Sequence, residues 1–361
     1  MKTNFKNILK AFVAVTMVAG TTSCEDFLNK EPMSDISPEA YFTSAAQLEA
    51  NLNDEYPNVL PSYGQWGYGI FGEDNGTDNQ IGVTANDRWT KDRWKVPHEE
   101  NDNWNFNRIY RINFFLSEVM PKFGEDLNGS QNTIGGDLAT VKHYIGEMYV
   151  NRAYEYFDML QKFGDLPIIT TALPDITEEL IEASKRQPRH KVARFIIEDL
   201  KKAEEMLLDN APGGKNRISK NVAYLLHARV ALYEATWEKY HRGTAFVPGG
   251  QGWPGSDAQG YNADSEIAYF LDEAMAASKK VGDQIVDVLA ENTDAPEGMD
   301  VKLTSLNPYY TMFCDEDMSG YGEILMWKRF NKSLGVTNNL QMELARNGGG
   351  SGWTRGMVNS F

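Results

Sequence analysis

Apolar side chains recur every three or four residues along the stretch VKHYIGEMYVNRAYEYFDMLQKF, which ends at residue 163. This spacing places them on one face of a helix of about six turns. Gly164 follows as a C-terminal cap, and Pro167 prevents the helix from resuming. Other helices must cover the apolar face, which consists of Val141, Tyr144, Ile145, Met148, Tyr156, Leu160 and Phe163.

Arg152 lies inside this apolar face, beside the small residue Ala153. A buried charge is tolerated only when it is paired with an opposite charge. We therefore interpret Arg152 as a structural arginine held by an acidic side chain from a neighbouring element.

Further amphipathic stretches follow the same period and are separated by short polar or glycine-containing breaks. Ser44 and Gln47 have the spacing of a capping box before the first stretch, and Ser219 is expected to cap a later one. The glycine-rich tail, residues 346–361, shows no capped element. The pattern predicts helices over residues 45–56, 105–120, 189–208, 220–240 and 264–281, with short elements at 309–313 and 323–327.

The stretch 220–240 has a second strong pattern of large apolar residues, and Arg229 lies within it as Arg152 does in the first helix. We expect this face to be buried. Its members are Val222, Leu225, Leu226, Leu232, Tyr233, Trp237 and Tyr240.

Successive amphipathic helices joined by short breaks indicate an all-α (mainly) fold. We predict a tetratricopeptide-like helical hairpin array with long irregular ligand-binding loops. The repeat spacing is irregular and most consensus tetratricopeptide residues are missing. The periodicity alone therefore does not identify a repeat family.

The first 23 residues have the pattern of a bacterial lipoprotein signal peptide. Three lysines precede the uncharged stretch 11–20, which is too short to cross a bilayer as a helix. Small residues then lead to Cys24, the predicted lipidation site, where several acyl chains would give lasting attachment to a membrane. We predict a signal peptide over residues 1–23 and one helical domain over residues 24–361.

Two stretches, residues 61–103 and 241–262, are long and irregular. The first interleaves aromatic rings with amide, carboxylate and guanidinium groups, and the second is rich in glycine and carries Trp253 and Tyr261. Flat aromatic faces cover the apolar sides of sugar rings, and the polar groups bond to the hydroxyls. The alternative is that individual tryptophans only anchor a loop onto the helices. The predicted ligand-binding residues are Trp66, Tyr68, Asp74, Asp78, Asn79, Arg88, Trp89 and Trp94 in the first loop and Trp253 in the second.

The formal net charge of −16 argues against nucleic acid as a partner and favours neutral ligands. The five histidines lack zinc-ligand spacing, and no GxSxG nucleophile motif occurs. The GxGxxG match at residues 67–72 follows no predicted strand and opens no predicted helix. We therefore predict no catalytic residue, no metal site and no cofactor.

Seven segments together resemble one known family, in the family's order and over nearly the whole chain after residue 23. The segments are CEDFLNKEP, YFTSAAQLEANLNDEY, WNFNRIYRINFFLSEV, EMYVNRAYEYFDMLQKFGDLPI, RHKVARFIIEDLKKAEEML, RISKNVAYLLHARVALYEATW and GWTRGMVNSF. On these segments the chain is similar to the SusD/RagB family of nutrient-binding outer-membrane lipoproteins of Bacteroidetes.

The resemblance implies a helical fold with tetratricopeptide-like pairs and a lipid anchor at Cys24. Glu25 and Asp26 resemble the acidic signal that exports such lipoproteins to the cell surface. The resemblance further implies binding of a glycan, or sometimes a peptide, and a position as a lid on a SusC-like TonB-dependent transporter. Family members usually continue well beyond the equivalent of Phe361, so it also implies that a C-terminal portion of the family fold is missing.

The resulting prediction is a lipid-anchored protein of the cell outer membrane that binds an oligosaccharide and passes it unaltered to a transporter. One alternative is a secreted glycoside hydrolase on a helical scaffold, which would need two carboxylates about 5 to 9.5 Å apart across an aromatic cleft. Another is a protein-interaction scaffold with idle loops. Sugar binding without bond cleavage separates the first reading from the other two.

Overall fold

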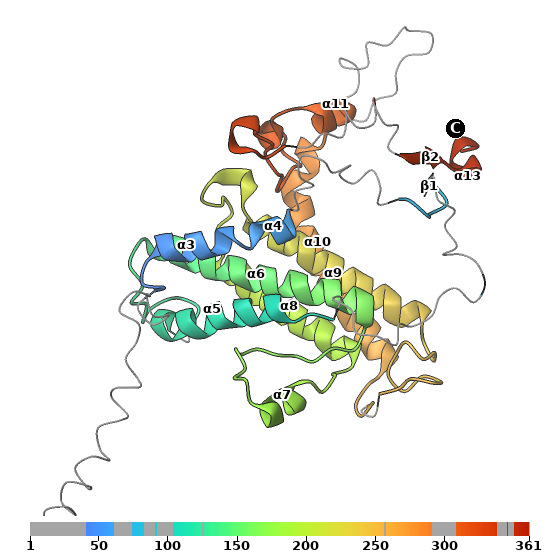
Figure 1. The fold of residues 1–361 in the computed structure, drawn as a ribbon, viewed down its shortest axis with the longest axis horizontal. Helices are drawn as coiled ribbons and strands as arrows, with labels where there is room; N and C mark the ends of the chain where they lie inside the picture. The colour runs from blue at the N-terminus through green and yellow to red at the C-terminus, as the bar shows by residue number, and fades with distance from the viewer. Residues whose placement is uncertain are drawn as a thin grey trace, which may run out of the picture. The chain divides into compact units, whose positions relative to one another are not determined.

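The computed structural model describes residues 41–60, 74–82, 91, 104–124, 126–255, 258–290, 308–337, 345 and 350–360. The chain divides into two compact units, Met1–Thr43 and Ser44–Phe361. The second unit is mainly helical where it is described (Figure 1), which confirms the predicted all-α class. The predicted signal peptide and Cys24 lie outside the described residues.

Apart from α4, α7 and α13, which match no predicted stretch, the helices of the described part agree with the predicted stretches to within a few residues at most ends. They are α3 (Ala45–Asn53), α4 (Tyr56–Val59), α5 (Asn107–Phe123), α6 (Leu138–Phe163), α7 (Thr177–Ala183), α8 (Arg189–Met206), α9 (Lys220–Tyr240), α10 (Ala263–Ile285), α11 (Pro308–Cys314) and α13 (Arg355–Val358). Short 3₁₀ turns are η2 (Gly214–Asn216), η3 (Val286–Val288), η5 (Met318–Gly320) and η6 (Lys332–Leu334).

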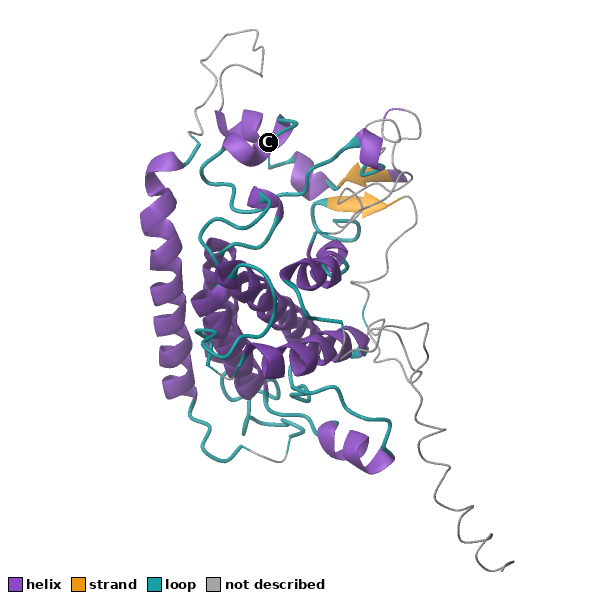
Figure 2. Cartoon of the chain, turned by 90° about the vertical axis from the view of Figure 1, so that its left-hand side faces the viewer, coloured by secondary structure: helices purple, strands orange, loops and turns teal. Residues whose placement is uncertain are grey.

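Consecutive long helices run antiparallel, as their side-chain contacts show. The start of α6 meets the end of α8, where the Leu208 amide donates to His143 Nδ1 at 3.1 Å. Asn221, near the start of α9, hydrogen-bonds to Gln284, near the end of α10, at 2.9 Å. Arg242, just after α9, forms an ion pair of 2.5 Å with Asp264 at the start of α10. The tetratricopeptide-like hairpin array is therefore confirmed. Figure 2 shows that helices, drawn in purple, make up most of the described part of the chain.

Helix α6 occupies the centre of this array, as its apolar face predicts. Asp137 caps its start by accepting from the Thr140 amide at 2.9 Å, and Gly164 ends it with a φ of 72°. A positive φ is costly for residues with a Cβ, so glycine suits this exit from the helix. Its fully buried side chains include Val141, Ile145, Met148, Tyr156 and Leu160.

Arg152 is buried and paired, which confirms its structural interpretation. Its Nε and Nη2 donate to the two carboxylate oxygens of Asp199 on α8, at 2.6 and 2.8 Å. Nη1 donates to Asn113 Oδ1 on α5 at 2.9 Å. One guanidinium thus joins three helices, and both of its main partners are completely buried.

The predicted buried face of α9 is wrong. Leu225 and Leu232 are each 52% exposed, Tyr240 is 74% exposed, and Arg229 faces solvent. Small and charged residues form the buried face instead, because α9 packs closely against α8 and α10 and supplies partners for their charges. These buried residues are Ala223, His227, Ala228, Val230, Ala231, Glu234, Ala235 and Glu238.

Three local predictions also need correction. Residues 323–327 form no helix or strand. Ser44 and Ser219 occupy N-cap positions, but neither side chain caps its helix. The tail does contain a capped helix, since Thr354 Oγ1 accepts from the Met357 amide at 3.1 Å at the start of α13.

The tail also pairs with the first long loop. Strands β1 (Gln80–Gly82) and β2 (Ser351–Trp353) are antiparallel, with Gln80 opposite Trp353 and Gly82 opposite Ser351. The Thr354 amide extends the pairing by donating to the Asn79 carbonyl at 2.9 Å. Figure 1 shows the cyan strand beside the red one, so segments far apart in sequence lie side by side.

Candidate functional site

A cleft beside Trp253 lies between the end of α6, the start of α8 and the loop that follows α9. It consists of two adjoining hollows of about 720 and 410 Å³. Both are lined by Asp165, Arg186, Trp253 and Pro254. The Trp253 cleft, as we call it, is therefore built from three segments that are distant in sequence.

The end of α6 delivers Asp165 to the cleft. After Gly164 turns the chain, the Leu166 and Gln187 backbones form an antiparallel bridge, with hydrogen bonds of 3.2 and 2.8 Å. Asp165 Oδ1 also accepts from the Arg189 amide at 2.9 Å, at the first residue of α8. These bonds fix the carboxylate of Asp165 near Arg186.

Asp165 is half-buried, and burial raises the pKa of its carboxyl above the ordinary value. Hydrogen bonds from the Arg189 amide and the Trp253 side chain act in the opposite direction by stabilising the charged form. The carboxylate is thus held by the same aromatic residue that forms the wall of the cleft.

The loop after α9 folds as a series of tight turns that present Trp253. The Gln251 amide donates to the Gly243 carbonyl at 2.9 Å, and the Trp253 amide donates to the Gly250 carbonyl at 3.1 Å. A Cβ at Gly255 would collide with the indole ring of Trp253. Glycine at this position lets the backbone lie directly against the ring.

Other aromatic rings extend the cleft. Phe246 is 60% exposed at its edge, and its carbonyl accepts from Trp237 Nε1 at 3.3 Å. Trp237 stacks on His241 with ring centroids 4.0 Å apart, and the Arg189 guanidinium lies 4.1 Å from its centroid on the ring face. The cleft therefore offers aromatic faces together with carboxylate, guanidinium and amide groups, a combination suited to a ligand with hydroxyls and apolar ring faces.

Two buried glutamates of α9 lie beneath the loop. Glu234 forms a two-point ion pair with Arg189, at 3.0 and 2.8 Å. Glu238 accepts from the hydroxyl of Tyr261, near the end of the loop. Burial raises the pKa of Glu238 to about 8, and the neighbouring Glu234 charge adds to this effect. Arg189 thus pairs directly with Glu234, and its charge only partly offsets the raised pKa of Glu238.

The structure places four of the predicted site residues. Trp253 lines the cleft, half-buried, whereas Asp74, Asp78 and Asn79 are exposed together in the turn before β1. Thr77 closes this turn by donating from its amide to the Asp74 carbonyl at 3.1 Å. The other predicted residues lie outside the described part of the chain: Trp66, Tyr68, Arg88, Trp89 and Trp94.

Sequence reasoning missed Asp165, Arg186 and Phe246 as cleft residues. Asp165 directly follows the glycine that ends α6, and chain exits of this kind commonly reach functional surfaces. Phe246 lies in the second predicted loop. The signal for Arg186 was absent, because a polar stretch does not indicate which of its side chains meets an aromatic loop.

Other features of the described residues bear on metal binding and on membrane crossing. Within those residues, no group of three or more His, Cys, Asp or Glu side chains is arranged to hold a metal ion. None of the helices described has both the length and the apolar character needed to cross a bilayer.

The sequence profile of the SusD-like family, described as "Starch-binding associating with outer membrane", matches residues 26–232, more than half of the chain. The chain belongs to this family. The resemblance drawn from the seven segments is therefore confirmed. This description names starch binding and association with the outer membrane. SusD-like proteins are carbohydrate-binding and non-catalytic.

Individual relatives are similar over part of their length. SusD-like protein P2 of Formosa agariphila is 27% identical over 237 residues, covering 64% of this chain and 45% of that protein. The crystal structure of a SusD-like protein from Bacteroides fragilis is 23% identical and covers 58% of this chain and 38% of that one, with a TM-score of 0.42. A laminarin-binding SusD-like protein is 16% identical, covering 72% and 47%, with a TM-score of 0.44. The chain spans less than half the length of the curated relatives it matches.

Proposed function

We propose that this protein is a cell-surface lipoprotein that binds an oligosaccharide and passes it, unaltered, to a SusC-like TonB-dependent transporter. The observation that carries the proposal is the Trp253 cleft in a chain of the SusD-like family. A glycan-binding cleft needs exposed ring faces beside hydrogen-bonding groups. The cleft has both, and it is wide enough for several sugar residues, judged by its hollows of about 720 and 410 Å³.

Each group in the cleft has a distinct part in this proposal. The indole of Trp253 and the ring of Phe246 cover the apolar faces of sugar residues. Asp165 accepts hydrogen bonds from sugar hydroxyls, and Arg186 donates to them. Arg186 is positioned by the ring of Trp104, whose centroid lies 4.4 Å from the guanidinium carbon.

The first long loop is proposed as a second part of the glycan surface. Asp74, Asp78 and Asn79 present polar groups in one exposed turn. The aromatic and basic residues predicted to bind with them are Trp66, Tyr68, Arg88, Trp89 and Trp94.

Attachment to the outer membrane is proposed to occur through Cys24. The signal pattern of residues 1–23 and the family's association with the outer membrane support this placement. Acyl chains on Cys24 would hold the helical unit at the cell surface, where a polymeric glycan is first met.

The experiment that tests the proposal is titration calorimetry of the purified protein against starch and a panel of plant, host and microbial polysaccharides, laminarin among them. Each mixture is then examined for shortened products. Saturable heat with intact polymer is the expected result. Shortened products would replace the proposal with a glycoside hydrolase, and a folded protein that gives no heat with any polymer would favour a protein-interaction scaffold.

A further inference from the structure

A separate hollow of about 460 Å³ lies where α4, the loop before α9 and residues 328 and 329 come together. We call it the Lys328 hollow. It shares no lining residue with the Trp253 cleft, so the two sites are distinct. Its lining consists of Glu49, Asn53, Tyr56, Pro57, Leu60, Gly213, Asn216, Arg217, Lys328 and Arg329.

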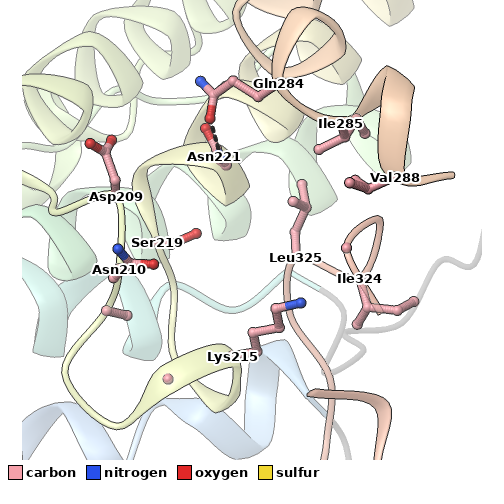
Figure 3. Close-up of a pocket in the computed structure, with 13 residues that line it drawn as sticks. Asp209, Asn210, Lys215, Ser219, Asn221, Gln284, Ile285, Val288, Ile324 and Leu325 are labelled. Atoms are coloured by element: carbon pink, nitrogen blue, oxygen red, sulfur yellow. Dashed lines mark hydrogen bonds between the residues drawn. The ribbon is translucent and has the colours of Figure 1, made fainter. Parts of the chain in front are cut away.

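The segment that carries Lys328 is fastened to the loop before α9. The Trp327 amide donates to the Lys215 carbonyl at 3.0 Å, and Asn216 Nδ2 donates to the Trp327 carbonyl at 2.9 Å. Lys215 Nζ donates to the Tyr321 carbonyl at 2.5 Å, and Figure 3 shows the Lys215 side chain pointing towards this segment. The wall of the hollow that faces α4 is therefore a fixed part of the fold.

Arg217 is buried at one side of the hollow, and its charge is already balanced. Its Nε and Nη2 donate to the two carboxylate oxygens of Glu147, at 3.0 and 2.9 Å. Its Nη1 donates to Asn53 Oδ1 at 2.8 Å and lies 3.4 Å from the carboxylate of Glu49, the one anion in the lining. Arg217 and Glu49 therefore shape the hollow without leaving a free charge in it.

Lys328 brings a positive charge that no carboxylate balances. Its Nζ donates to the Leu60 carbonyl at 2.8 Å, which uses one of its three N–H groups. The side chain is half-buried and forms no ion pair with the part of the chain that the structure describes. Burial lowers the pKa of Lys328, and no neighbouring anion opposes this change. An anion beside Nζ would remove the cost of this uncompensated charge.

Arg329 adds a second cation at the edge of the hollow. It is exposed and, within the described residues, has no carboxylate at ion-pair distance. It also lines a neighbouring hollow with Asp317, where hydrogen bonds from Ser319 and, less strongly, the charge of Arg329 lower the pKa of that carboxyl. Two adjacent cations thus remain available in a chain whose formal net charge is −16.

These groups select the charge of the ligand. An oxyanion can accept from Lys328 Nζ, from the Arg329 guanidinium and from Asn53 Nδ2, and it also balances the positive charges. A neutral hydroxyl can accept the same hydrogen bonds, but it displaces water from the cations and leaves their charges unbalanced. An ammonium group would be repelled.

The rest of the lining indicates what carries the oxyanion. The side chains of Tyr56, Pro57 and Leu60 add an apolar wall beside the cations. A bare inorganic ion gains nothing from such a wall. The volume lies within the range of about 300–1,000 Å³ that is typical of sites for small organic ligands.

We infer that the Lys328 hollow binds a small organic acid, of the size of one sugar unit, through a carboxylate, sulfate or phosphate group. The inference goes beyond the proposed function. It does not require the Trp253 cleft to bind anything.

The test is titration calorimetry of the full chain with sugars that share one ring and differ in charge. Glucose is the neutral probe, and glucuronate, glucose 6-sulfate and glucose 6-phosphate carry the three oxyanions. We expect at least one charged sugar to bind saturably, at least about tenfold more tightly than glucose, and to weaken as the salt concentration rises.

Three results of these titrations would overturn the inference. The first is binding of glucose as tight as that of every charged sugar. The second is the absence of saturable heat with all charged sugars. The third is binding of inorganic phosphate or sulfate as tight as that of the best charged sugar, because the apolar wall would then have no part.

Variants of the two cations locate the site. Lys328→Gln and Arg329→Gln should each weaken the charged sugar at least about fivefold, whereas Lys328→Arg keeps the charge and should stay within about threefold of the unchanged protein. Arg229→Gln, at an exposed position on α9, is the matched control and should change nothing. Unchanged affinity in both Lys328→Gln and Arg329→Gln would contradict the inference.

Circular dichroism checks that each variant is folded. If Lys328→Gln does not fold because its bond to Leu60 is lost, Arg329→Gln and Lys328→Arg decide the matter, since neither removes that bond. Polysaccharide heat without binding of any charged sugar would reject the Lys328 hollow alone. The reverse result would reject the Trp253 cleft alone.

Discussion

At the scale of single residues, Trp253 and Asp165 are the pair that gives the cleft its character. They are separated in the chain by three α-helices and the 3₁₀ turn η2, yet the indole side chain hydrogen-bonds to the carboxylate. A ring held in this way loses little freedom when a ligand stacks on it, because its position is already set. Preformed contacts of this kind contribute more to affinity than mobile ones.

Trp253→Ala should therefore weaken binding of the polysaccharide by at least about 1 kcal/mol, roughly fivefold, while the helical content stays the same. The same loss is expected for Trp89→Ala or Trp94→Ala if the first loop shares the ligand. Calorimetric titration and circular dichroism measure the two quantities. Tyr240→Ala, which removes a 74% exposed ring outside the cleft, is the matched control. Equal affinity in the tryptophan variants would remove those residues from the site.

Arg152 illustrates a different residue-scale effect. Arg152→Met leaves the buried Asp199 carboxylate without its main cation, so we expect the free energy of unfolding to fall by about 3–5 kcal/mol. Urea denaturation measures this loss. Lys162→Met breaks the exposed pair with Asp158 and should cost under about 1 kcal/mol, because water screens that pair. Similar losses in both variants would contradict the structural interpretation of Arg152.

At the scale of elements, α9 exposes several large residues of the face that was predicted to be buried, and it buries a face of small and charged residues instead. Its alanines allow α8 and α10 to approach closely, and its buried Glu234, Glu238 and His227 match charges or hydroxyls on neighbouring segments. Large exposed residues such as Leu232 contribute little to this packing. Packing against α8 and α10, rather than the size of its own side chains, therefore decides which face of α9 is buried.

Two substitutions one residue apart test that orientation. Ala231→Leu overfills a fully buried position and should lower the free energy of unfolding by about 1–3 kcal/mol. Leu232→Ala, at a position 52% exposed, should change it by less than about 1 kcal/mol. Thermal or urea unfolding distinguishes them, and the opposite order would show that the larger residue faces the core.

Glu234 and Glu238, the buried carboxylates beneath the loop after α9, make the stability of this part of the fold depend on pH. The folded pKa of Glu238, about 8, is above the unfolded value near 4.5, so folding favours its protonated form. The stability that it contributes is complete below pH 4.5 and is lost as the pH rises towards 8. Arg189 and Glu234 face this group from α8 and α9, and Tyr261 from the loop.

Glu238→Gln should therefore flatten the fall in unfolding free energy between pH 4.5 and 8, and raise that free energy at pH 8 by about 1–3 kcal/mol. Urea denaturation at several pH values gives the profile. Glu179→Gln, at an exposed position on α7, serves as the control and should leave the profile unchanged. A profile that keeps its slope in Glu238→Gln would assign the pH dependence to other groups.

At the scale of the whole molecule, the sequence predicts the succession of helices well, because a repeat of 3.6 residues and the end of α6 at Gly164 are local signals. It does not predict the Trp253 cleft, since Asp165, Arg186 and Trp253 meet only through the packing of α6, α8 and the loop after α9. The buried face of α9 was missed for the same reason. A pattern of large apolar residues does not record how close the neighbouring helices lie.

The proposed anchor also belongs to this scale. Cys24→Ser should move the protein from the outer-membrane fraction to the soluble fraction, because the acylated residue is lost while the helical unit is untouched. Fatty-acid labelling and cell fractionation measure the change. Persistent membrane association without label would point to attachment through a protein partner.

The pairing of β1 with β2 has a consequence for the order in which the parts of the chain fold. The Thr354 hydroxyl donates to the Asp78 carbonyl, 276 residues earlier. Bringing two segments so far apart together costs loop-closure entropy before their contacts stabilise the pair. The helical hairpins, whose contacts are more local, should therefore form before the turn that holds Asp74, Asp78 and Asn79 reaches its final pairing.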